Sequence, residues 1–287
     1  MKAWKADFLL ILVTIGWGAS FILTKIALVE LSVFNMLAIR FIIAFFMSSI
    51  IFLKEMKKID VKTLKYGILV GTLLFVCFTF QTLGLNRSIA TKTAFISGLS
   101  VVLVPLITTI LNRKAPNLKI TVSVILAVIG MGLMTLKGKV NGVNLGDIFS
   151  FISAVTFALY IISVSKYTKV VKAIPFAIIQ LGTVATMCIL KVLTTETFKI
   201  PVNLDSWISI LILSIVCTSG AYIIQNVVQK YTSATHTALI FTAEPVFAAF
   251  FAFIIFNEFI GLKGIFGAVL ILIGMLVAEF GNFKKKV

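Results

Sequence analysis

Long apolar runs separated by short polar segments dominate the pattern along the 287-residue chain. A helix that crosses a membrane needs about 20 apolar residues, because each residue advances it by about 1.5 Å. Runs of roughly this length lie at residues 8–29, 33–53, 66–85, 93–111, 118–136, 148–165, 173–193, 207–228, 236–256 and 264–281. The connections between them carry helix breakers and are too short for a separate soluble domain. The pattern predicts an all-α polytopic membrane protein with ten transmembrane helices.

Composition supports this class of protein. The chain is 60% hydrophobic and 13% charged, whereas soluble proteins are about 45–50% apolar and about 25% charged. Its net charge of +16 could suggest a nucleic-acid partner, but the basic residues cluster between the apolar runs, which is typical of membrane topology signals. Cys77, Cys188 and Cys217 lie inside apolar runs without metal-ligand spacing, so we expect small buried hydrophobic residues there.

The distribution of lysine and arginine predicts the orientation, because cytoplasmic loops carry an excess of these residues. With the N-terminus in the cytoplasm, that side holds 17 basic residues, namely Lys2, Lys5, Lys54, Lys57, Lys58, Lys62, Lys65, Arg113, Lys114, Lys119, Lys166, Lys169, Lys172, Lys230, Lys284, Lys285 and Lys286. The opposite side holds 7, namely Arg87, Lys92, Lys137, Lys139, Lys191, Lys199 and Lys263. We therefore expect a multi-pass protein of the plasma or inner membrane with both termini cytoplasmic.

The chain contains an internal repeat. Gln81 matches Gln225, and Ile129-Gly130-Met131 matches Ile273-Gly274-Met275, in both cases 144 positions apart (225 − 81). The repeat divides the chain into residues 1–138 and 139–287, each with five predicted helices. Because five is an odd number, the two halves must cross the membrane in opposite orientations. Inverted repeats are typical of secondary transporters, whose binding site lies near the midplane between the halves.

Four segments resemble the drug/metabolite transporter superfamily, EamA type: GWGASFILTKIAL, LAIRFIIAFF, TKTAFISGLSVVLVPLITTIL and THTALIFTAEPVFAAFFAFIIFNE. The resemblance implies two tandem EamA-like units, a central cavity lined by helices 1–4 and 6–9, and transport of small metabolites, often outward and ion-driven. The recurrent family positions fall at Trp17, Gly18, Lys25, Arg40, Pro105, Glu244, Pro245 and Glu258. The second unit departs at its start, where FALYI replaces WGASF.

Glu244 and Pro245 stand side by side within the ninth apolar run. An ionisable group at mid-membrane depth costs roughly 2.5–3.5 kcal/mol or more, and a proline within a helix removes a backbone donor and bends the helix. We therefore expect a kink at Pro245 beside a cavity. Glu244 could bind a proton or a cationic group of a substrate, or it could pair with Arg40, whose predicted depth differs by only about 6 Å.

Several other residues are candidates for the cavity. Lys25 could either snorkel to the outer interface or join Arg40 in making the outer half of the cavity electropositive. Trp17 could cap the cavity or simply pack, Pro105 is a candidate kink in the fourth helix, and His236 is expected at the surface of the inner mouth. The polar residues expected in the pocket or in helix–helix hydrogen bonds are Gln81, Tyr160, Gln180, Tyr222, Gln225 and Asn226.

Motifs for catalysis, metal binding or ATP hydrolysis are not found in the sequence, so we expect neither an enzyme nor a cofactor. The sequence favours a secondary transporter that moves small polar metabolites, such as amino acids or related solutes, by alternating access. Export is the expected direction, and proton coupling through Glu244 is a hypothesis. Alternatives are an importer, a sugar or nucleotide-sugar carrier of the same superfamily, and a membrane scaffold without transport. The expected partners are the lipid bilayer and a small-molecule substrate, with no nucleic acid, and the protein could be a monomer or a homodimer.

Overall fold

The computed structural model describes residues 3–88, 90–113, 115–135, 144–256 and 261–280. Regular structure in these ranges is entirely helical. The helices are α1 (Ala3–Leu28), α2 (Val33–Ile51), α3 (Leu53–Met56), α4 (Val61–Arg87), α5 (Ala90–Gly98), α6 (Ser100–Asn112), α7 (Leu118–Thr135), α8 (Leu145–Tyr167), α9 (Ala173–Thr195), α10 (Leu204–Ser214), the π-helical segment η1 (Ile215–Gly220), α11 (Ala221–Gln229), α12 (Ala234–Phe241), α13 (Glu244–Phe256) and α14 (Gly261–Phe280). Glu258 lies outside the described residues.

Eight of the predicted crossings are long and apolar enough to span a membrane over the described residues. Three of these eight are composite, because α5 continues into α6, α10 passes through η1 into α11, and α12 is followed by α13. The apolar helices α7 and α14 fall short of a full span over the residues searched, Leu118–Leu133 and Gly261–Val277. The prediction of a polytopic all-α protein is therefore confirmed, whereas the count of ten crossings stays a prediction.

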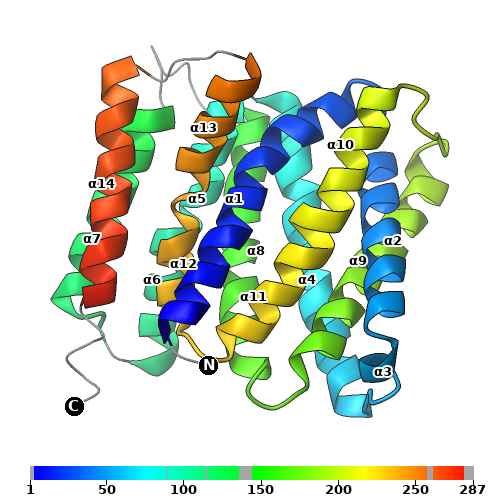
Figure 1. The fold of residues 1–287 in the computed structure, drawn as a ribbon, viewed down its shortest axis with the longest axis horizontal. Helices are drawn as coiled ribbons and strands as arrows, with labels where there is room; N and C mark the ends of the chain where they lie inside the picture. The colour runs from blue at the N-terminus through cyan, green and yellow to red at the C-terminus, as the bar shows by residue number, and fades with distance from the viewer. Residues whose placement is uncertain (1–2, 89, 114, 136–143, 257–260, 281–287) are drawn as a thin grey trace.

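The helices stand side by side in one bundle, with α7 and α14 at one edge and α2 and α9 at the other (Figure 1). The start of α1 and the end of α14 lie at the same end of the bundle (Figure 1). The lipid-facing surface is apolar, since large hydrophobic side chains such as Ile110, Leu193 and Phe266 are exposed. An apolar exterior of this kind is what a bilayer requires of the helices that border it.

Contacts between the helices follow the internal sequence repeat. The repeat relates α7 to α14 and α2 to α9, and in the structure each of these helices packs against its own counterpart. The repeat also relates α4 to the pair α10 and α11, and α8 to α1. In the structure α4 packs on α8, and correspondingly α10 and α11 pack on α1. Finally, α1 packs on α12 and α13, and α8 packs on the related pair α5 and α6.

Small residues set the close approach of α7 to α14. A Cβ atom added at Gly130 would lie 2.5 Å from the carbonyl oxygen of Gly267, and one at Gly274 would lie 2.9 Å from the carbonyl oxygen of Ser123. Backbones that approach this closely exclude any side chain at the contact. The glycines of the fifth and tenth predicted crossings are thus used for packing within the chain.

At the end of the bundle opposite the start of α1, two glutamates join the connections that precede α2 and α10. The carboxylate of Glu196 accepts hydrogen bonds from the Ser32 hydroxyl and from the backbone N–H of Asn35, at 2.5 and 3.0 Å. The carboxylate of Glu30 accepts from the backbone N–H groups of Val202 and Asn203. These contacts bind the first repeat to the second outside the apolar core.

Candidate functional site

A cavity with a mixed polar and aromatic lining lies between the two halves of the bundle; we call it the central cavity. Its lining residues are Trp17, Ser20, Phe21, Arg40, Cys77, Phe78, Gln81, Ala94, Ser97, Gly98, Ser100, Met131, Ser153, Phe157, Tyr222, Ala238, Phe241, Thr242, Glu244, Pro245 and Ala248. Its free volume is about 60 Å³, which is room for a few water molecules. Pockets for drug-sized ligands measure about 300–1,000 Å³, so the helices must separate before a metabolite fits.

Glu244 lies where the ninth predicted crossing is interrupted. Helix α12 ends at Phe241, a turn follows at Thr242 and Ala243, and Glu244 and Pro245 open α13. Proline is tolerated in the first turn of a helix because its missing N–H would have no partner there. The positive end of the α13 dipole also favours a carboxylate at this position. The interruption therefore explains why an acid and a proline stand together within an apolar run.

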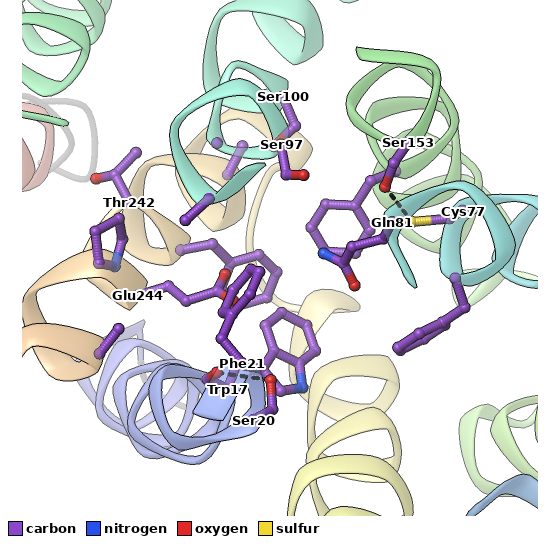
Figure 2. Close-up of a pocket in the computed structure, with 18 of the residues that line it drawn as sticks. Trp17, Ser20, Phe21, Cys77, Gln81, Ser97, Ser100, Ser153, Thr242 and Glu244 are labelled. Carbon is purple, nitrogen blue, oxygen red and sulfur yellow. Dashed lines mark hydrogen bonds between the residues drawn. The ribbon is translucent and has the colours of Figure 1, made fainter. Parts of the chain in front are cut away.

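The carboxylate of Glu244 faces the cavity. Figure 2 shows its side chain extending from α13 among the labelled residues, with Trp17 and Phe21 of α1 on one side and Ser97 on another. Glu244 is half-buried, and in the described part of the chain its carboxylate has no hydrogen bond and no ion pair. Its exposed atoms are thus available to a proton, to water or to a solute.

Trp17 sits at the centre of an aromatic cluster beside Glu244. Its ring centroid lies 4.7 Å from that of Phe241, 5.3 Å from that of Tyr222 and 5.8 Å from that of Phe157. Its indole N–H donates to the carbonyl oxygen of Cys217 at 2.9 Å. Trp17 therefore both packs against its aromatic neighbours and lines the cavity.

Arg40 is 3% exposed and also lines the central cavity. Its Nε atom donates to the Thr218 hydroxyl at 2.7 Å, and its guanidinium carbon lies 4.8 Å from the ring centroid of Phe78. Among the described residues no carboxylate, that of Glu244 included, lies within ion-pair distance of Arg40. The Arg40–Glu244 pair that the sequence allowed is therefore not formed in this conformation.

The π-helical segment η1 supplies the partners of both Trp17 and Arg40. A π-helix bonds i to i+5 and often marks a functional site. Here the Thr218 hydroxyl donates to the carbonyl oxygen of Leu213 at 2.7 Å, five residues back, while it also accepts from Arg40. The Cys217 carbonyl is free to accept from Trp17. No motif in the sequence indicated this segment.

Three of the predicted pocket residues instead form a closed network outside the cavity lining. The Tyr160 hydroxyl donates to the Gln180 side-chain oxygen at 3.0 Å, and the Gln180 amide nitrogen donates to the Asn226 side-chain oxygen at 3.0 Å. Asn226 in turn donates to the Tyr222 carbonyl at 2.8 Å. The network joins α8, α9 and α11, and all three side chains are fully buried, so we interpret them as helix–helix contacts.

The other sequence candidates divide between the cavity and the surrounding structure. Gln81, Tyr222 and Pro245 line the central cavity. Gln225 is fully buried and donates to Gln229 at 3.2 Å. Lys25 is exposed on α1 and lines neither cavity described here, which favours the snorkelling alternative. Pro105 lies inside α6, and the interruption of the fourth predicted crossing is at Leu99.

A second and larger cavity, of about 1,040 Å³, opens at the end of the bundle where α1 begins; we call it the terminal cavity. It is lined by Pro105 and Asn112 of α6, Lys166 of α8, His236 of α12 and neighbouring residues. The expectation that His236 lies at the surface is wrong, because its side chain is buried with Nε2 3.0 Å from a carboxylate oxygen of Asp7. The pair fixes the start of α1 to the start of α12.

Comparison with known proteins places these features in a family. The model of the EamA-like transporter family matches residues 4–136 and 144–280, that is, once in each half of the chain. The chain belongs to the EamA-like transporter family. An uncharacterized transporter of Archaeoglobus fulgidus is 31% identical over 280 residues, which cover 97% of this chain and 87% of that protein.

More distant matches extend the comparison. An S-adenosylmethionine uptake transporter of Rickettsia bellii is 29% identical over 256 residues, which cover 84% of this chain and 82% of that protein. A solved crystal structure superimposes with a TM-score of 0.83 at 15% identity and covers 99% of both chains, which shows a shared fold. The chain is thus a multi-pass member of a transporter family, as the sequence motifs indicated.

The cavity also contains residues that the sequence did not single out. Ser97, Ser100, Ser153, Phe157 and Phe241 all line it. The hydroxyl of Ser97 is buried and has no hydrogen-bond partner within the described chain. Serine and phenylalanine are common in apolar helices, so their types carried no signal. The internal repeat could have identified one of them, because Ser100 stands 144 positions before Glu244 (244 − 144).

Proposed function

We propose that the protein is a secondary transporter that carries a small polar metabolite across the plasma or inner membrane by alternating access between its two inverted repeats. The carboxylate of Glu244, unpaired in a polar cavity at an interrupted helix, carries this proposal. Ionisable residues inside membrane-spanning bundles are costly and mark substrate or proton pathways. Transporters also use interrupted helices at the midplane to form their sites. The names of the relatives support transport over catalysis.

The relation between the two cavities supports alternating access. Along α6 the central cavity reaches Ser100 and the terminal cavity begins at Pro105. Along α12 the corresponding residues are Ala238 and His236. At about 1.5 Å per residue, only about 3–8 Å of packed side chains separates the two cavities along these helices. A small displacement of α6 and α12 would therefore join the central cavity to one side of the membrane.

Proton coupling follows from the two states of Glu244. The ionised carboxylate can attract a proton or a cationic group of the solute, and the neutral acid releases the cation. Competition of this kind at one carboxylate exchanges protons for substrate. We propose export as the direction: the solute leaves the cell in exchange for protons that enter down their gradient. The Rickettsia relatives named as uptake transporters favour import as a second candidate, and the same exchange would then run in reverse.

Transport by purified protein in liposomes tests the proposal. Vesicles are loaded with a mixture of amino acids, nucleosides and sugars, and mass spectrometry follows efflux with and without an imposed pH gradient. We expect selective efflux that the gradient accelerates, and loss of the acceleration in Glu244→Gln. Asp205→Asn, which neutralises an exposed acid at the start of α10, should behave as the wild type. Folded protein without selective flux of any solute in either direction would overturn the proposal.

A further inference from the structure

The terminal cavity is large and basic. Its volume of about 1,040 Å³ is at the upper end of the range for pockets that hold drug-sized ligands, about 300–1,000 Å³. Lys166 near the end of α8 and Lys169 just beyond it line the cavity, and its described lining contains no carboxylate. Neither lysine has an ion-pair partner in the part of the chain that the structure describes. Two unpaired positive charges at one cavity attract anions.

The start of α12 adds hydrogen-bond donors to this cavity. The Ser233 hydroxyl caps the helix by accepting from the backbone N–H of His236 at 3.1 Å. The backbone N–H groups of Ala234 and Thr235, which also line the cavity, have no acceptor among the described residues. Free N–H groups and the positive end of the helix dipole favour an anion at such a position.

A buried histidine in the same wall lacks one of its partners. His236 lines the terminal cavity and is 6% exposed. Its Nε2 lies 3.0 Å from a carboxylate oxygen of Asp7, and Nε2 carries the shared proton because a carboxylate only accepts. Its Nδ1 is buried and has no hydrogen-bond partner within the described chain. A buried polar atom without a partner is costly, and a protonated Nδ1 would donate to an anion in the cavity.

The terminal cavity also has an apolar margin. Leu111, near the end of α6, lines the cavity and is at the same time 65% exposed. Ile110 beside it and Leu118 at the start of α7 are exposed as well. Exposed leucine and isoleucine side chains on membrane-spanning helices face the acyl chains of the bilayer. The cavity therefore connects a basic interior with the lipid-facing surface.

From this arrangement we propose that the terminal cavity binds the head group of an anionic phospholipid. The phosphate lies between the two lysines and the start of α12, and the acyl chains follow the exposed side of α6. Basic pockets between membrane-spanning helices are suited to anionic head groups. A free phosphate ester would leave the apolar margin unused, and a zwitterionic phospholipid would bring a cationic group next to Lys166 and Lys169. The site is separate from Glu244 and from the solute of the central cavity.

Direct binding to the purified, detergent-solubilised chain tests the inference. Native mass spectrometry follows titrations with dioctanoyl phosphatidylglycerol, with dioctanoyl phosphatidylcholine and with glycerol phosphate. We expect phosphatidylglycerol to bind roughly tenfold more tightly than phosphatidylcholine, the order of effect that two lysines near an anionic head group produce. Glycerol phosphate should bind more weakly than phosphatidylglycerol because it lacks the acyl chains.

A double variant locates the basic part of the site. Lys166→Gln combined with Lys169→Gln should lower the affinity for phosphatidylglycerol by about tenfold and remove the preference over phosphatidylcholine. The matched control is Lys119→Gln combined with Lys230→Gln. It removes two exposed lysines from the segments next to the cavity that do not line it, and it should bind phosphatidylglycerol as the wild type does.

A single variant locates the apolar part. Leu111→Ser should weaken phosphatidylglycerol but leave glycerol phosphate unchanged, because only the lipid has acyl chains to lie against this residue. Leu193→Ser is the control, since Leu193 is 73% exposed on α9 and does not line the cavity. It should change neither affinity.

Three outcomes would overturn the inference. Equal affinity of the wild type for the two phospholipids would exclude selection by the head group. Equal losses in the two double variants would reduce the effect to the general charge of the surface. Glycerol phosphate bound as tightly as phosphatidylglycerol would make the ligand a free phosphate ester instead of a lipid. None of these results concerns solute flux, so the proposed function would be unaffected.

Discussion

Single residues define the chemistry of the central cavity, and Glu244 and Arg40 show what a sequence can say about them. Their predicted depths are similar, and both side chains do line one cavity. The sequence could not establish whether they meet, because depth along a helix is fixed by residue count, whereas the direction of a side chain depends on helix rotation. The turn at Ala243 and the hydrogen bond to Thr218 determine those directions.

The indole N–H of Trp17 gives a prediction at this scale. Trp17→Phe retains an aromatic ring but removes the donor to the Cys217 carbonyl. A buried acceptor left without its partner costs about 1–3 kcal/mol. We expect a lower melting temperature in detergent and slower transport. Trp4→Phe is the matched control, since Trp4 is 57% exposed, and a variant as stable as that control would show that the hydrogen bond contributes nothing.

The connection that Glu30 stabilises gives a second prediction. Hydrogen bonds from the backbone N–H of Val202 and from the Ser206 hydroxyl lower the pKa of Glu30 below its ordinary value. A carboxyl whose folded-state pKa is depressed stabilises the fold above its unfolded pKa, about 4.3, and this contribution is lost as the pH falls through the folded-state pKa. We expect Glu30→Gln to lower the melting temperature at pH 7 and to reduce its decline between about pH 5 and 3.

Asp205→Asn, at an exposed position in the first turn of α10, just after this connection, provides the comparison for Glu30→Gln. Melting curves recorded over the same pH series distinguish the two variants. Equal pH profiles for Glu30→Gln and the wild type would exclude a contribution from this glutamate.

Interrupted helices are the main feature at the scale of elements. The breaks at Leu99 and Ala243 are 144 residues apart (243 − 99), the same offset as the sequence repeat. Only the second has a proline close by, at Pro245 in the first turn of α13, whereas Pro105 lies inside α6, six residues after Leu99 (105 − 99). A break in the backbone is fixed by tertiary contacts as well as by local sequence, and this is why η1 also escaped prediction.

Close packing of α1 on α13 next to the site gives a third prediction. A Cβ atom at Gly18 would lie 2.6 Å from the Cβ of Phe247 and 2.8 Å from the backbone nitrogen of Ala248. Because backbone atoms cannot yield cheaply, Gly18→Ala should push the helices apart at a cost of about 1–3 kcal/mol. The displacement should also disturb Trp17 and Glu244, so transport should fall more than stability.

Gly16 on the same helix supplies the control for Gly18→Ala. A Cβ atom there would meet only a side-chain carbon of Val216, at an ordinary contact distance of 3.7 Å. Gly16→Ala should therefore keep wild-type transport and stability in the liposome and melting assays. If both variants were equally active, the contact between α1 and α13 would not position the site.

At the scale of the whole molecule, the hydropathy pattern predicted most of the architecture. Apolar length alone identified helices near every predicted crossing, because a bilayer imposes one length and one surface chemistry on all of them. The two helices that the repeat relates at the ends of the halves, α7 and α14, pack against each other, a pairing that the sequence did not predict. The cavity walls were less predictable, since Gln180 and Asn226 satisfy each other in the core while Ser97 and Ser153 face the cavity.

The orientation of the bundle gives the last prediction, which belongs to this scale because it concerns every crossing at once. The excess of lysine and arginine predicts that the connection before α4 faces the cytoplasm and that the connection before α10 faces outward. Lys62 is exposed in the first turn of α4, directly after the first of these connections, Val202 is exposed in the second, and the native cysteines Cys77, Cys188 and Cys217 are buried. A membrane-impermeant maleimide should therefore label Val202→Cys in intact cells but Lys62→Cys only after permeabilisation, with the wild type as background. The reverse pattern would place both termini outside, and the proposed export would then become uptake through the same cavity.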